Sequence, residues 1–162
     1  MIRPAEVQDA RSIMDIWNLV ISTTTHNFSS TLKTQEGVAA QIADHWAAGH
    51  GIWVAELAGE VVGFASYGQF RGGNGYARCM EHSVHLTEAA RGKGLGRALM
   101  TVLEDHARQG GAHQMIGGIS GENTAGQAFH AALGYAPIAR IPQAGWKWGR
   151  YLDLVLMQKM LS

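Results

Sequence analysis

The chain of 162 residues carries 13 basic and 13 acidic side chains. Its formal net charge of zero gives no electrostatic reason to expect a nucleic-acid partner. The length suits a single domain over residues 1–162, and a hydrophobic fraction of 46% can fill its core. The one cysteine, Cys79, excludes an internal disulfide. No apolar run approaches the roughly 20 residues of a membrane span, so we expect a cytoplasmic protein with no membrane partner.

The first third of the chain predicts a short strand and two helices. Ile2–Pro4 favours a strand, and Asp9 is expected to cap a helix. The apolar residues of that helix follow helical spacing at Ile13, Ile16, Trp17, Val20 and Ile21. Ser22–Leu32 is rich in Ser and Thr, which indicates a loop or a lip over a substrate site. A second helix is predicted over about Thr34–Ala48.

The rest of the chain predicts hairpins at its ends and alternating strands and helices between them. Ile52–Leu57 and Val61–Tyr67 predict a hairpin, followed by a glycine-rich loop over Gln69–Arg78. The later expected elements are a strand at Met80–Leu86, a helix ending near Gln109, a strand at His113–Ile119, a helix at Thr124–Leu133 and strands at about Ala136–Pro142 and Tyr151–Met160. This order predicts a mixed α/β sheet flanked by helices.

The stretch from Arg91 to Arg97 is the strongest functional signal. It joins a predicted strand to a predicted helix through three glycines. Glycine allows positive φ and close approach of a ligand, and the free N–H groups of a first helical turn favour an anion. The spacing matches neither a P-loop nor a dinucleotide-binding turn, since the latter requires glycine at position 97. The pattern therefore predicts a phosphate site of another kind, or a plain structural turn.

The pattern Arg91-x-x-Gly94-x-Gly96 resembles the pyrophosphate loop of the GNAT superfamily of N-acetyltransferases. Asn123 and the run Ala128–Tyr135 follow it as that superfamily's later motifs do. Together with Glu81–Val84 and Pro142–Asp153, they look like the phosphinothricin and methionine sulfone or sulfoximine N-acetyltransferases. The resemblance implies a mostly antiparallel sheet with a splayed strand pair, acetyl-coenzyme A as co-substrate, a small amino-acid-like acceptor, direct attack in a ternary complex and a homodimer.

The resemblance also implies roles for particular residues. Glu81 would be the base that deprotonates the amine, and His130 would protonate the departing thiolate. The residues expected to bind the cofactor are Val84, His85, Leu86, Arg91, Gly92, Lys93, Gly94, Leu95, Gly96, Arg97 and Asn123. Those expected to bind the substrate are Arg71, Gly72, Gly73, Glu81, His82 and Ser83. Phe28, Trp146 and Trp148 are candidates for an apolar pocket, although tryptophans at this spacing more often belong to a core or subunit interface.

Structural readings of the same residues stay open at this point. Glu81 could be a solvated strand residue, His130 a hydrogen-bonded structural histidine, Asn123 a helix cap and Arg71 a surface arginine. No metal site is expected, because His82 and His85 would point to opposite faces of a strand. Two rival functions are acetylation of another small amine or a protein N-terminus, and a non-catalytic acetyl-coenzyme A sensor.

Overall fold

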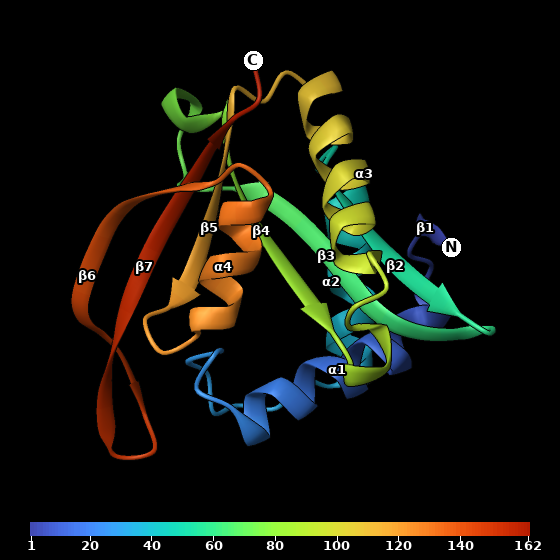
Figure 1. The fold of residues 1–162 in the computed structure, drawn as a ribbon. Helices are drawn as coiled ribbons and strands as arrows, with labels where there is room; N and C mark the ends of the chain where they lie inside the picture. The colour runs from blue at the N-terminus through green and yellow to red at the C-terminus, as the bar shows by residue number, and fades with distance from the viewer.

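The computed structural model describes all residues 1–162 as one α/β domain (Figure 1). Its strands are β1 (Ile2–Pro4), β2 (Gly51–Leu57), β3 (Glu60–Gln69), β4 (Cys79–Leu86), β5 (Gln114–Ser120), β6 (Ala136–Lys147) and β7 (Arg150–Met160). Its helices are α1 (Ala10–Thr23), α2 (Gln35–Ala47), α3 (Leu95–Gln109) and α4 (Thr124–Ala132). Three short 3-10 turns, η1 (Val7–Asp9), η2 (Asn74–Tyr76) and η3 (Glu88–Ala90), complete the elements. No helix combines the length and apolar character needed to cross a membrane.

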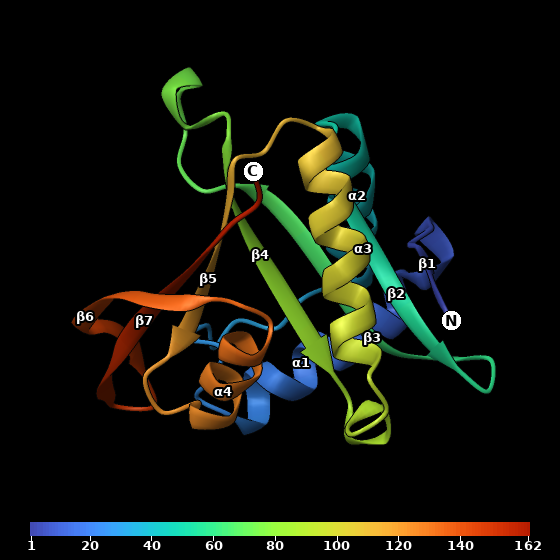
Figure 2. The same ribbon diagram turned by 45° about the horizontal axis from the view of Figure 1, so that its top comes forward.

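The seven strands form one sheet in the order β1-β2-β3-β4-β5-β7-β6. Neighbouring strands are antiparallel except β4 and β5, which run parallel. Helices α1 and α2 pack on one face of β2 and β3, and α3 packs on the other (Figure 2). The mixed, mostly antiparallel sheet flanked by helices that the sequence predicts is confirmed.

The sheet divides at its centre, between β4 and β5. The two strands pair only from Cys79 to His82, opposite Gln114 to Gly117. Beyond His82, β4 continues to pair with β3, and β5 continues to pair with β7. Figure 2 shows β4 and β5 diverging below this point, with α4 beside the opening. The splayed strand pair implied by the resemblance is therefore present.

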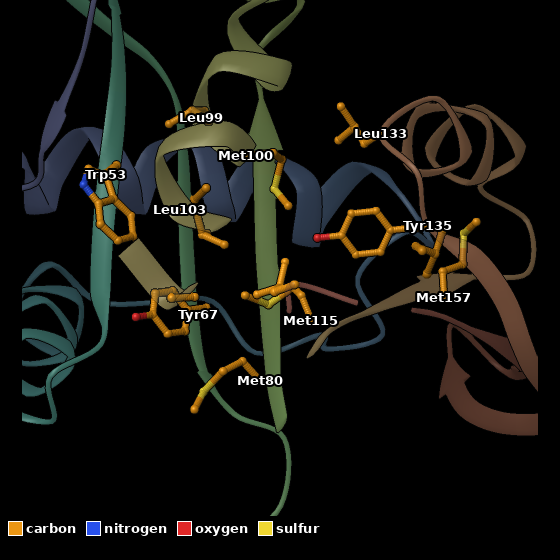
Figure 3. Close-up of a cluster of buried hydrophobic side chains, with 14 of the residues drawn as sticks. Trp53, Tyr67, Met80, Leu99, Met100, Leu103, Met115, Leu133, Tyr135 and Met157 are labelled. Carbon is orange, nitrogen blue, oxygen red and sulfur yellow. The ribbon is translucent and has the colours of Figure 1, made fainter. Parts of the chain in front are cut away.

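The larger hydrophobic cluster lies between α3 and the sheet, as Figure 3 shows. Leu99, Met100 and Leu103 of α3 are fully buried there against Met115 of β5 and its neighbours. Burial of each such side chain contributes about 2 kcal/mol to the free energy of unfolding. The spacing of these helical residues places them on one side of α3, so the helix is held firmly against the sheet. Its N-terminus is thereby fixed beside the end of β4.

Two local predictions about the elements are wrong. Asp9 does not cap α1 with its side chain. Its carboxylate instead accepts two hydrogen bonds of 2.8 Å from Arg3 and one of 2.7 Å from the backbone N–H of Glu6, because the guanidinium offers a matching pair of donors. Strand β6 extends to Lys147 rather than ending near Pro142, because Gly145 to Lys147 resume pairing with β7 after a register shift.

Candidate active site

A cavity of about 580 Å³ lies where β4 and β5 separate, and we call it the main cavity. Four segments of the chain supply its walls: the end of α1 with the residues that follow it, β4 with the adjoining turn, the end of β5 with the adjacent part of β7, and α4 with its cap. The lining residues are Val20, His26, Asn27, Phe28, His82, Ser83, Val84, His85, Leu86, Arg91, Gly118, Ile119, Ser120, Leu154, Asn123, Ala125, Gly126, Phe129 and His130. Side chains therefore do not fill the region where β4 and β5 diverge, and a ligand-sized cavity remains there.

The peptide groups of Val84 and Leu86 face this cavity unpaired. Thr87 donates its N–H to the carbonyl of Val62 in β3, 2.9 Å away. Since the peptide groups of an antiparallel strand alternate in direction, His85 and Ser83 also bond to β3, while Val84 and Leu86 point away from it. Strand β5 has already departed at these positions. Two residues of β4 thus offer free hydrogen-bonding groups to an extended ligand.

A second cavity of about 300 Å³, which we call the phosphate cavity, lies at the N-terminus of α3. Arg91, Gly92, Gly94 and Arg97 are among the residues that line it. The N–H groups of Leu95, Gly96 and Arg97 donate to no carbonyl of the chain, and Gly94 supplies no side-chain cap. Unsatisfied helical N–H groups beside guanidinium groups suit a bound pyrophosphate.

The glycines of the turn have different physical roles. Gly92 and Gly94 have φ of 72° and 75° with open space where a β-carbon would lie, so the backbone conformation is what requires them. Gly96 is buried, and a β-carbon there would lie 2.8 Å from Leu86 Cδ1 and 3.0 Å from Phe129 Cε2. The neighbouring side chains alone therefore require glycine at position 96. Lys93 is exposed and lines neither cavity.

Glu81 is exposed, one residue before the strands part, and it is not among the residues that line the main cavity. Gly118 of the neighbouring strand β5 does line that cavity. The Glu81 Oε2 lies over Gly118, 3.3 Å from where a β-carbon would be. Although the residue as a whole is exposed, partial desolvation of the Glu81 carboxyl over β5 raises its pKa above the usual value. A carboxylate with a raised pKa beside the cavity is suited to accept a proton from an ammonium group.

His82 and His130 meet on the other face of β4. His130 Nδ1 lies 2.7 Å from the carbonyl oxygen of Gly126, which can only accept, so this nitrogen carries the hydrogen. In the neutral ring, Nε2 is then an acceptor, and it lies 3.2 Å from His82 Nε2. Burial lowers the pKa of both rings, that of His82 to about 3. His130 can donate a proton from Nε2 only after that nitrogen has been protonated.

His85 and Asn123 also line the main cavity. The His85 ring packs against Trp17 and Phe64, with centroids 6.0 and 5.1 Å away, and burial lowers its pKa to about 4. Its peptide group is committed to β3, so only its side chain faces the cavity. Asn123 caps α4 by accepting a hydrogen bond from the N–H of Gly126, 2.8 Å away. The Asn123 Nδ2 donates to no group of the chain and remains free for a ligand.

The structure does not bring every expected residue to the cavity. Arg71, Gly72 and Gly73 lie in the loop between β3 and β4, where Arg71 packs over the ring of Tyr76, and they line neither cavity. Phe28 lines the main cavity as expected. Trp146 and Trp148 line neither cavity, since both project from the β6–β7 hairpin and are 58% and 55% exposed, which leaves the subunit-interface interpretation of these two residues.

Several lining residues were not predicted individually. His26 and Asn27 belong to the polar segment expected to form a lip, but that composition does not indicate which side chains face inward. Ser120 and Leu154 reach the cavity through the pairing of β5 with β7, a register that local sequence does not reveal. The structure holds no group of three or more His, Cys, Asp or Glu side chains arranged to bind a metal ion.

Comparisons with known proteins agree with this geometry. The model of the acetyltransferase (GNAT) family matches residues 14–135. An L-methionine sulfoximine/L-methionine sulfone acetyltransferase of Pseudomonas aeruginosa is 39% identical over 99% of this chain and 94% of its own. A phosphinothricin N-acetyltransferase of Alcaligenes faecalis is 30% identical over 99% of this chain and 82% of its own. The structure of a Salmonella typhimurium acetyltransferase with its cofactor acetyl-CoA has a TM-score of 0.95 and 36% identity, covering 100% of this chain and 94% of that one.

Proposed function

The chain belongs to the acetyltransferase (GNAT) family, and from this premise we propose that it acetylates the amino group of a small amino acid or an analogue. Methionine sulfoximine, methionine sulfone and phosphinothricin are the acceptors we propose, since they give the two similar enzymes their names. The acetyl donor is acetyl-CoA, which supplies the thioester for the reaction. The observation that carries the proposal is the opening between β4 and β5, with the Glu81 carboxylate lying over Gly118 of its lining.

We propose that the donor is bound by two sets of unpaired peptide groups, one at the N-terminus of α3 and one on β4. The N–H groups of Leu95 to Arg97, with Arg91 nearby, are suited to the pyrophosphate. Gly92 and Gly94 shape the turn, and Lys93 adds positive charge at its surface. Val84 and Leu86 can pair with the amide groups of the pantetheine arm, and Asn123 can donate to the same arm. The phosphate cavity and the main cavity share Leu86, Arg91 and Phe129, so one elongated molecule could occupy both.

For the reaction, the amine nitrogen attacks the thioester carbonyl carbon, and the carbon–sulfur bond breaks. Glu81 takes a proton from the substrate ammonium, directly or through water, before attack. After attack the nitrogen gives up its second proton to water as the amide forms. The sulfur leaves as a thiolate and takes a proton from His130 or from water. A proton on His130 Nε2 would have to displace the contact with His82, so the acid role of His130 stays a prediction.

For the acceptor, Arg71 with Gly72 and Gly73 is proposed to bind the acidic end of the amino acid. Since this loop lies outside the main cavity of the free chain, that role requires the loop to reach the bound substrate. His82 and Ser83, on the cavity wall beside Glu81, are proposed to contact the acceptor. The acceptor-binding role of this loop is tested by measuring the affinity for the acceptor in an Arg71→Ala variant.

We further propose a cytoplasmic homodimer with an interface near Trp146 to Leu156. Trp146, Trp148 and Tyr151 are all more than half exposed on the β6–β7 hairpin. Aromatic residues of this kind are enriched at interfaces.

The deciding experiment is release of coenzyme A from acetyl-CoA with a panel of amines. The panel contains the three proposed acceptors, unrelated small amines and peptides with free N-termini. Turnover confined to peptides would favour protein acetylation. A thermal midpoint raised by acetyl-CoA, without turnover of any amine, would favour the sensor. Turnover of the proposed acceptors supports the assignment.

A further inference from the structure

Lys147 is a buried ammonium whose hydrogen-bond partners are all carbonyl groups, and its Nζ also lies 4.8 Å from the ring centroid of Trp148. The residue is 1% exposed at the end of β6. Its Nζ donates to the carbonyl oxygens of Ile21, Thr24 and Asn27 at 2.6, 2.7 and 2.7 Å. An ammonium has three N–H donors, so all of them are used. A buried charge with such a complete set of partners fixes the segments that supply them.

The three carbonyls belong to one end of α1 and to the segment that follows it, Thr24 to Phe28, which we call the lip. Ile21 lies in the last turn of α1, where carbonyl groups have no helical partner and a cation is favoured. The other two carbonyls lie in the lip itself, which has no regular secondary structure. Lys147 thus supplies hydrogen bonds that the local backbone cannot provide.

The same face of β6 makes a second contact with the lip. Gly145 and Lys147 are two residues apart, so their side-chain positions share a face of the strand, while Trp146 points to solvent. The ring of Phe28 lies directly over Gly145, where a β-carbon would be 2.5 Å from Phe28 Cδ2. The aromatic side chain that lines the main cavity is therefore seated on β6.

The lip forms a wall of one cavity only. His26, Asn27 and Phe28 line the main cavity, and no residue of the lip lines the phosphate cavity. In Figure 1 the chain after α1 lies beneath β5 and α4, away from the N-terminus of α3. Displacement of the lip would alter the main cavity and leave the phosphate cavity intact.

We propose that Lys147 is a positioning residue for the acceptor amine, acting through the lip that it holds against the main cavity. The proposal rests on the acetyltransferase function proposed above, because it assigns the lip to the acceptor rather than to the donor. Lys147 touches neither reactant and is not a catalytic residue. Its loss should weaken acceptor binding while the donor binds as before.

A separate contact ties the lip to the turn after β5. Thr25 Oγ1 donates to Glu122 Oε1 at 2.6 Å, and Arg150 Nη2 donates to the same oxygen at 2.8 Å. This contact is exposed, so it contributes little to the free energy of unfolding. Thr25→Val therefore loosens the lip by a route that leaves Lys147 in place.

The test compares Lys147→Met with Lys159→Met. Lys159 donates to both oxygens of buried Glu104 at 2.8 and 2.9 Å, and it lines neither cavity. Both variants lose a hydrogen-bonded ammonium, but only the first releases the lip. The measurements are kcat, the KM for the amine, the KM for acetyl-CoA and the rate at which chymotrypsin cleaves after Phe28.

We expect Lys147→Met to raise the KM for the amine about tenfold, with kcat and the KM for acetyl-CoA within about twofold of the parent. Cleavage after Phe28 should accelerate in Lys147→Met and not in Lys159→Met. Thr25→Val should also raise the KM for the amine and the rate of cleavage after Phe28, but by less than Lys147→Met does. If Lys147→Met does not fold, the same measurements are made on Lys147→Gln, which keeps two N–H donors, and they test the proposal in its place.

A folded variant at position 147 with parental amine KM and parental cleavage overturns the proposal, as does an equal rise in both KM values. A parent enzyme that turns over no amine refutes the proposed function instead. In that case the cleavage rates still show whether Lys147 holds the lip.

Discussion

The imidazole rings of His82 and His130 stack where the sheet divides, with centroids 5.0 Å apart and an interplanar angle of 16°. His82 is fixed by β4 and His130 by α4, so the pair joins the strand to the helix across the opening. The His82 Nδ1 is buried with no partner in the chain. Burial disfavours the charged form of either ring, and two positive charges at this distance would also repel, so the folded state favours neutral rings.

This arrangement predicts acid sensitivity. The pKa of His82 falls from its ordinary 6.5 to about 3 on folding. The unfolded chain therefore binds a proton below pH 6.5 that the folded chain does not, and stability is lost as the pH falls from 6.5 toward 3. One such group costs about 2 kcal/mol between pH 7 and pH 5. Urea denaturation at both pH values measures the loss, and His82→Gln should reduce it by about that amount. An unchanged pH dependence in the variant would contradict this account.

Glu81→Gln should lower kcat by about 10²–10⁴-fold at pH 7, because the amide cannot take a proton. The KM for acetyl-CoA should stay near the parental value. The defect should shrink as pH rises, since more amine then arrives deprotonated. Because desolvation raises the pKa of Glu81, parental activity should fall as the carboxylate is protonated at acidic pH. The exposed Glu60→Gln is the control, and a fully active Glu81→Gln enzyme would exclude the base role.

Gly94→Ala should impair acetyl-CoA binding more than folding. Gly94 and Gly59 have φ of 75° and 81°, and neither has an atom within 4 Å of the position of a β-carbon. Each alanine variant should therefore lose about 1–2 kcal/mol of stability for the same conformational reason. Only Gly94→Ala should raise the KM for acetyl-CoA, because Gly59 lies in the β2–β3 turn away from both cavities. Equal KM values in the two variants would refute the phosphate-binding role of this turn.

Light scattering at micromolar concentration should give the mass of a dimer. The double variant Trp146→Ser and Tyr151→Ser should shift the mass toward a monomer, since the two rings pack together on the exposed hairpin with centroids 4.7 Å apart. Leu19→Ser, which removes an apolar side chain of similar exposure from α1, is the control. A monomeric parent protein would remove the homodimer proposal.

The order of strands and helices and the position of the glycine turn were predicted well from the sequence. Hydrophobic periodicity, turn-forming residues and the glycine spacing of a phosphate-binding turn are all local properties of the chain. Gly92 and Gly94 have the positive φ that such a turn requires. The splay of β4 from β5 was known only through the resemblance, since it depends on which strands pair. The partnership of His82 with His130 also escaped prediction, because it joins residues 48 positions apart on different elements.

The contribution of position 147 was missed for the same reason. A lysine between two tryptophans looks like a solvated hairpin residue, and only tertiary structure shows that its ammonium is buried under the end of α1. Gly96 illustrates the opposite case. Its motif suggested room for a ligand, whereas Leu86 and Phe129 occupy the space beside it. Sequence pattern identified where glycine is needed without identifying why.

The place of β7 in the sheet has a consequence for biosynthesis. This strand is translated after β6 but lies between β5 and β6. Until it leaves the ribosome, β5 has an open edge that invites pairing with other chains. Lys147 and Ile21, whose contact spans 126 positions, can meet only at that late stage. During synthesis, the turn proposed to bind the phosphates can therefore form before the lip is held against the main cavity. A chaperone that binds the nascent chain at this stage binds a sheet that still lacks β7.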